Sequence, residues 1–116
     1  MNTSYFAKLN RISFPISISR FSPSFYTGIA YLTLAPSVEL LTGYKNNSLS
    51  KEDYTNQFNK YLGALDIRKI YNELFNIYGS DDFTLLCYEK PNEFCHRHLV
   101  AEWFKKNGYK VEELSW

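Results

Sequence analysis

The sequence has little cysteine, little glycine and no excess of charge of either sign. Two cysteines among 116 residues are too few for a disulfide scaffold, and their C-x7-C spacing does not fit a zinc ribbon or finger. We therefore expect reduced thiols. Thirteen Lys and Arg against twelve Asp and Glu give a net charge of +1, which excludes a strongly basic nucleic-acid-binding protein and an acidic tail.

Long apolar runs and signal segments are also missing. No run approaches the ~18 apolar residues of a membrane span, and no basic start precedes an apolar segment. We therefore expect a cytoplasmic protein that makes no contact with a membrane.

Several enzyme signatures are absent as well. The sequence has no Gly-rich run ending in Lys-Ser or Lys-Thr, no G-x-G-x-x-G and no G-x-S-x-G, so a P-loop, a dinucleotide fingerprint and a nucleophile elbow are excluded. A phosphatase or rhodanese loop needs Arg six positions after Cys95, where Ala101 stands. We expect no cofactor.

The pattern of apolar residues predicts one domain over residues 1–116, in which strands alternate with helices. Ser37, Ser50 and Asp66 have the side chains and positions of helix N-caps, and Gly79 and Gly108 are placed to end helices. Expected strands cover 3–7, 13–19, 83–88 and 109–111; expected helices begin at Ser37, Ser50, Asp66 and Phe94; and residues 21–36 are expected to form a long loop.

The run from Phe83 to Tyr88 is continuously apolar, which is typical of a strand buried on both faces of a parallel sheet. A helix is expected directly after it. Strand, crossover helices and strand in this order predict a small α/β fold with a short, mostly parallel sheet.

Cys95-His96-Arg97-His98 opens the helix that follows this buried strand. In open parallel sheets, ligands bind where strands end and helices begin. The first turn of a helix favours anions and thiolates, and a guanidinium adds a two-pronged donor for a phosphate or carboxylate. Arg20 would bring a second guanidinium to this edge if the two strands are neighbours.

Purely structural interpretations stay open at each of these positions. Cys95 is equally well explained as a small packed residue. Arg97 can instead pair with Glu93 or Asp82, and Glu89, just past the strand, can be a solvated turn residue.

Three segments together resemble a known family. The string LLCYEKPNEFCHRHLVAEW at 85–103, ISRFSP at 18–23 and LAPSVELL at 34–41 are similar to those of domain-of-unknown-function family 488. The resemblance covers about residues 3–112 and implies a Rossmann-like three-layer α/β domain of the kind encoded in bacteria and phages. It supplies no reaction. Many members carry Asp before the Arg of the second strand, where this sequence has Ser19.

Our first functional hypothesis is binding of a small anionic ligand of the nucleotide or nucleoside type, with transferase or glycosidase-like chemistry. Glu89 is the best-placed acid or base, and Cys95 or His96 are the alternative reactive groups. The residues expected to bind the ligand are Arg20, Arg97 and Ser19, with Tyr5, Phe21 and Tyr88 as stacking aromatics.

Two further hypotheses stay open. The protein can be a non-enzymatic factor that sequesters a ligand or inhibits another protein. It can also hold a metal through Cys87, Cys95 and His96, with Glu89 nearby. Binding of nucleic acid is disfavoured because Lys and Arg are scattered along the chain.

Overall fold

The computed structural model describes residues 1–114 of the chain. Its sheet has five strands in the order β3-β2-β4-β1-β5, and every pair of neighbours is parallel. The α/β prediction with a parallel sheet is confirmed. The strands are β1 (Asn2–Tyr5), β2 (Pro15–Ser17), β3 (Ile29–Ala30), β4 (Thr84–Cys87) and β5 (Glu112–Glu113).

Within residues 1–114, four α-helices and two short 3-10 helices connect these strands. They are η1 (Phe6–Arg11), η2 (Leu32–Leu34), α1 (Val38–Lys45), α2 (Lys51–Gly63), α3 (Ile67–Tyr78) and α4 (His96–Lys106). The three predicted N-caps are confirmed, because the side chains of Ser37, Ser50 and Asp66 each accept a backbone N–H in the first turn. Gly79 ends α3 with φ 69°, a left-handed conformation that glycine adopts without strain.

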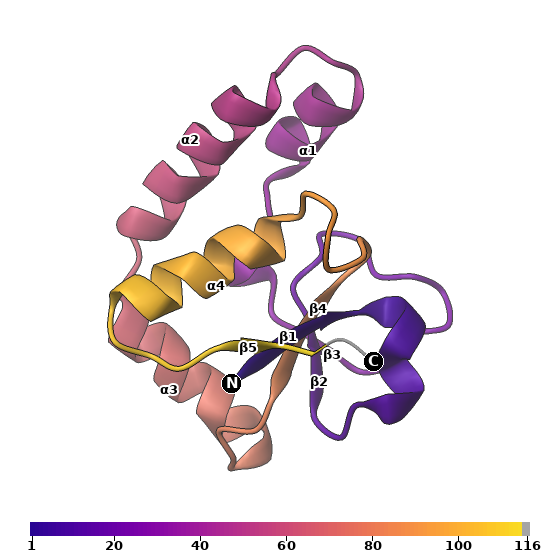
Figure 1. Ribbon diagram of the computed structural model, residues 1–116, viewed down its shortest axis with the longest axis vertical. Coiled ribbons are helices and arrows are strands. Elements are labelled where there is room, and N and C mark those ends of the chain that lie inside the picture. Colours follow the sequence, from indigo (N-terminus) through magenta and orange to yellow (C-terminus); the bar gives the residue numbers. More distant parts are fainter. Residues whose placement is uncertain (115–116) are drawn as a thin grey trace.

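The sheet separates two apolar clusters, which makes the domain three-layered. Leu85 lies in the larger cluster with residues of all four α-helices, whereas Leu86 lies with Phe6 and Tyr26 in the smaller one. Successive side chains of a strand point to opposite faces, so β4 contributes to both clusters. Figure 1 shows the α-helices on one side of the sheet and η1 on the other.

The central strand β4 determines which loops meet at the carboxyl edge of the sheet. It pairs with β2 on one side, where Ser17 lies opposite Leu86, and with β1 on the other, where Tyr5 lies opposite Cys87. The segments after β2 and β4 therefore leave the sheet side by side. The condition under which Arg20 would reach the same edge as the Cys95 segment, that their strands are neighbours, is therefore met.

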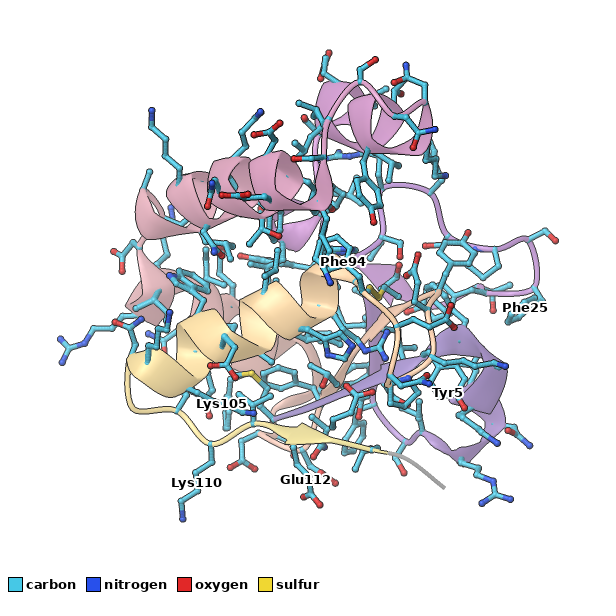
Figure 2. All side chains as sticks on the ribbon, turned by 45° about the horizontal axis from the view of Figure 1, so that its top comes forward. Tyr5, Phe25, Phe94, Lys105, Lys110 and Glu112 are labelled. Atoms are coloured by element: carbon cyan, nitrogen blue, oxygen red, sulfur yellow. A yellow bond between two sulfur atoms is a disulfide. The ribbon has the colours of Figure 1, made fainter. Side chains whose placement is uncertain are left out.

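Several predicted boundaries are wrong. The first strand ends at Tyr5 because Phe6 starts η1, and the second is confined to Pro15–Ser17. Residues 21–36 are not a continuous loop, because Ile29–Ala30 pairs with β2 and is followed by η2. Phe25 projects from the preceding part of this segment into solvent (Figure 2).

The last strand and the last helix are also shifted. β5 is Glu112–Glu113 rather than 109–111, because residues 112–113 are those that lie beside Asn2 and Thr3 of β1. The last helix starts at His96 rather than Phe94, with Cys95 as its N-cap residue. None of the helices in the described part of the chain has the length and apolar character that a bilayer crossing requires.

The buried position of Leu85 in β4 predicts a large stability cost for its truncation. Leu85→Ala should lower the free energy of unfolding by about 2–5 kcal/mol, because it leaves a cavity in the main cluster. Leu32→Ala, at a site 43% exposed, is the matched control and should cost much less. Urea unfolding measures both, and equal losses would contradict the assignment of the core.

Candidate functional site

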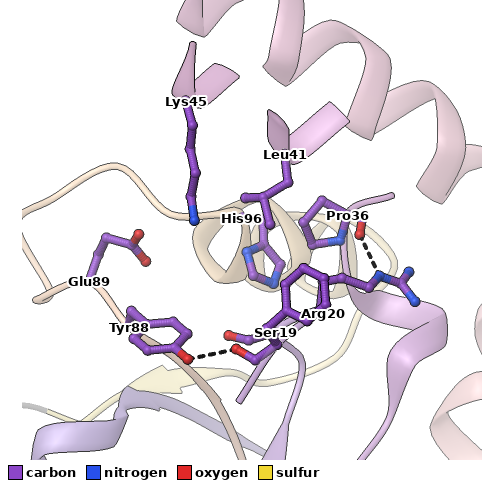
Figure 3. A pocket seen from close by; sticks show the side chains of 9 residues that line it. Ser19, Arg20, Pro36, Leu41, Lys45, Tyr88, Glu89 and His96 are labelled. Atoms are coloured by element: carbon purple, nitrogen blue, oxygen red, sulfur yellow. Dashed lines mark hydrogen bonds between the residues drawn. The ribbon is translucent and has the colours of Figure 1, made fainter. Parts of the chain in front are cut away.

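A pocket of about 340 Å³ opens at the carboxyl edge of the sheet. Its walls are formed by the segments after β2 and β4, by the first residue of α4, and by α1 with the loop before it (Figure 3). Its nine lining residues are Ser19, Arg20, Phe21, Pro36, Leu41, Lys45, Tyr88, Glu89 and His96. Six of these nine were predicted as site residues from the sequence; Pro36, Leu41 and Lys45 were not.

Two cationic side chains border the pocket. Lys45, in the last turn of α1, extends into it toward the space between Glu89 and His96 (Figure 3). Arg20 lies at the rim, where its Nε donates to the carbonyl of Pro36 over 2.9 Å. Within the described part of the chain, neither Lys45 nor the Nη atoms of Arg20 has an acidic partner. Both charges are therefore available to an anion.

Ser19 places an unsatisfied hydroxyl at the wall of the pocket. The residue is 4% exposed, and its Oγ has no hydrogen-bond partner among the described residues. A buried hydroxyl without a partner loses about 1–3 kcal/mol of hydration. A ligand atom that donates to or accepts from Ser19 would recover this loss.

Two aromatic rings line the pocket while remaining open to solvent. Phe21 and Tyr88 are 61% and 48% exposed, and the Tyr88 hydroxyl donates to the carbonyl of Phe21 over 2.7 Å. This bond joins the segment after β2 to the segment after β4. Exposed rings fixed at a pocket offer flat apolar faces to a planar group.

His96 is a neutral imidazole at the base of the pocket. Burial lowers its pKa to about 4, and the neighbouring charges of Arg97 and His98 act in the same direction. Its Nε2 lies 2.6 Å from the carbonyl of Ile18, so Nε2 carries the proton and donates it to that oxygen. Nδ1 therefore has the free electron pair, and it lies 3.8 Å from Cys95 Sγ.

The two cysteines are joined to each other beside His96. Cys87, at the end of β4, and Cys95, at the N-cap of α4, form a disulfide, so the prediction of reduced thiols is wrong for this form of the protein. The C-x7-C spacing did not predict their contact, because only the fold brings the end of β4 and the start of α4 together. In this form Cys95 offers no thiolate to a ligand, and it does not line the pocket.

Arg97 does not line the pocket either. It is completely buried, and its guanidinium forms a two-pronged ion pair with Glu113, at 3.1 and 2.8 Å. Nη1 also donates to the carbonyl of Glu89 over 2.6 Å and contacts Cys87 Sγ at 3.0 Å. The alternative pairing with Glu93 or Asp82 is wrong, because β5 places Glu113 closer.

Tyr5 and Glu89 both lie against this buried guanidinium, but only Glu89 lines the pocket. The Tyr5 ring lies 5.9 Å from the Arg97 guanidinium carbon and does not line the pocket. Glu89 is held through its backbone carbonyl, which leaves its carboxylate exposed at the pocket. Among the described residues that line the pocket, Glu89 carries the only carboxylate.

Comparison with known proteins places most of the chain in a family. Residues 18–108 match the family model DUF488-N3a, described as the active DUF488-N3 subclade. These residues include every part of the pocket. No curated protein and no solved structure matches the chain.

The buried ion pair predicts a strong effect of removing the carboxylate of Glu113. Glu113→Gln should lower the free energy of unfolding by about 3 kcal/mol, because it leaves the buried charge of Arg97 unpaired. The neighbouring exposed Glu112→Gln is the control and should change stability by less than about 0.5 kcal/mol. Denaturant unfolding measures both. Equal losses of stability would show that the burial of Arg97 does not require the Glu113 carboxylate.

Proposed function

This chain belongs to the DUF488 family, and we propose that it binds a small anionic ligand of the nucleotide or nucleoside type in the pocket. The main support for this proposal is that two cationic side chains and one buried hydroxyl face the same pocket. Among the described residues, Lys45 and Arg20 have no acidic partner, and the buried hydroxyl of Ser19 has no hydrogen-bond partner. A phosphate would satisfy all three kinds of group.

The position of the pocket supports the same ligand class. It lies outside the carboxyl ends of the adjacent parallel strands β2 and β4, where ligands of open α/β sheets bind. The N-terminus of α4 adds the partial positive charge of a helix start, and none of the described side chains caps it.

The aromatic wall favours a ligand with a planar ring. Phe21 and Tyr88 are exposed and linked by the hydrogen bond between the Tyr88 hydroxyl and the Phe21 carbonyl. Stacking of a base on an aromatic side chain contributes about 1–3 kcal/mol. A ligand with a phosphate near Lys45 and a base near these rings is a nucleotide.

A reaction on the bound ligand would use Glu89. Its backbone is fixed by Arg97 while its carboxylate faces the pocket, which suits a general acid or base for transferase or glycosidase-like chemistry at the sugar. The description of the matched subclade as active favours an enzyme over a protein that only sequesters its ligand.

Binding is tested by isothermal titration calorimetry with nucleoside monophosphates and the corresponding unphosphorylated nucleosides. We expect the monophosphate to bind more tightly, and Lys45→Gln to weaken its binding about 10-fold or more, as for loss of a charged hydrogen bond. Lys69→Gln, an exposed lysine on α3, is the matched control and should bind like the wild type. Equal binding by both variants would contradict the role of Lys45, and no binding to any nucleotide would contradict the proposed function.

Turnover is tested separately, by denaturing the complex after incubation and analysing the released ligand by mass spectrometry. We expect a cleaved product with the wild type, in which water accepts the released group. Glu89→Gln should still bind the ligand but release it unchanged, because the substitution keeps the backbone contact with Arg97. Unchanged ligand from the wild-type protein would reject the reaction and favour sequestration.

A further inference from the structure

Three side chains that can ligate a metal meet beneath the pocket. Cys87, Cys95 and His96 are all buried, and one ligand atom from each lies within 4.8 Å of the others. Two sulfurs and one imidazole form a donor set that suits zinc. We propose that, once its disulfide is reduced, the protein binds one Zn²⁺ ion through these three residues.

The protonation of His96 fits this role. Its Nε2–H is donated to the Ile18 carbonyl, which leaves the electron pair on Nδ1, the nitrogen 3.8 Å from Cys95 Sγ. Histidines that ligate metals usually donate their other ring N–H to a carbonyl or carboxylate in this way. With bonds of about 2.3 Å to sulfur and 2.0 Å to nitrogen, two ligand atoms of a tetrahedral zinc lie about 3.6 Å apart.

The surroundings of Cys87 fit a thiolate. Nη1 of Arg97 points to its sulfur at 3.0 Å, and a thiolate accepts such a charged hydrogen bond better than a disulfide sulfur does. The charges of two thiolates and a divalent cation would cancel, and those of Arg97 and Glu113 already cancel within their ion pair.

The backbone spacing also suits two separate ligands. The Cα atoms of Cys87 and Cys95 are 7.3 Å apart, whereas disulfides usually span roughly 4.4–6.8 Å. Two side chains that meet at a metal ion, rather than at each other, need the longer span.

Zinc loading begins with reduction of the disulfide. A dithiol reductant supplies two electrons and two protons to the Cys87–Cys95 bond and is oxidised to its own disulfide, leaving two thiols. Binding of Zn²⁺ then releases the two thiol protons to solvent.

The fourth ligand position would face the pocket. His96 and Glu89 both line it, and the Glu89 carboxylate lies 3.6 Å from Cys87 Sγ. Zinc with three protein ligands and a free position can activate a water molecule or polarise a ligand oxygen. The site would thus place a Lewis acid next to the proposed nucleotide.

The site is tested with Co²⁺ as a spectroscopic probe and Zn²⁺ as a competitor. The protein is reduced with a dithiol, which is then removed by anaerobic gel filtration before Co²⁺ is added. We expect sulfur-to-cobalt charge-transfer absorption and tetrahedral d–d bands at one Co²⁺ per chain, lost when Zn²⁺ is added. Protein that keeps its disulfide should show neither band.

Three variants make the assignment specific, and circular dichroism checks that each is folded. Cys95→Ser and His96→Gln should lose stoichiometric binding, whereas His98→Gln, the other histidine of α4, should keep it. Reduced, folded wild-type protein with two titratable thiols and no cobalt bands would overturn the proposal. Full binding by folded His96→Gln would overturn it too. Nucleotide titration of the metal-free, disulfide-bonded protein tests the proposed function independently of this result.

Discussion

The buried guanidinium of Arg97 is the interaction on which the carboxyl edge of the sheet depends. It lies in the first turn of α4 and contacts groups from the ends of three strands: Glu113 of β5, Cys87 of β4 and the ring of Tyr5 from β1. A buried charge of this kind is tolerated only when its donors are satisfied. The positions of these three strand ends are therefore coupled through Arg97.

The pocket follows from this constraint. Because Arg97 also binds the backbone carbonyl of Glu89, the turn after β4 is fixed while the Glu89 carboxylate stays exposed. His96 precedes Arg97 on α4, and its bond to the Ile18 carbonyl connects the same helix to the segment after β2. One helix start thus organises two strand ends, and the space between them is the pocket.

Local sequence signals predicted much of this arrangement. The caps at Ser37, Ser50 and Asp66 depend only on neighbouring residues, and the apolar run before Tyr88 identified the buried strand. Since ligand sites of parallel sheets lie where strands end, the same reasoning found most of the residues that line the pocket, such as Arg20.

What could not be predicted depends on contacts between distant segments. Glu113 pairs with Arg97 only because β5 lies beside β1, and two-residue strands such as β5 have no periodicity to detect. Arg97 was predicted to bind the ligand because the sequence alone does not distinguish an exposed arginine from a buried one. Lys45 was missed because a lysine in the last turn of a helix is adequately explained by the helix dipole.

The most direct test of this account is where a nucleotide binds. Titration of isotopically labelled protein with a nucleoside monophosphate, followed by NMR of backbone amides, maps the contact residue by residue. If the nucleotide binds in the pocket, the largest shift changes fall on residues 19–21, 88–89 and 96 around it. Changes confined to η1 or α3, or none at saturating ligand, would contradict it.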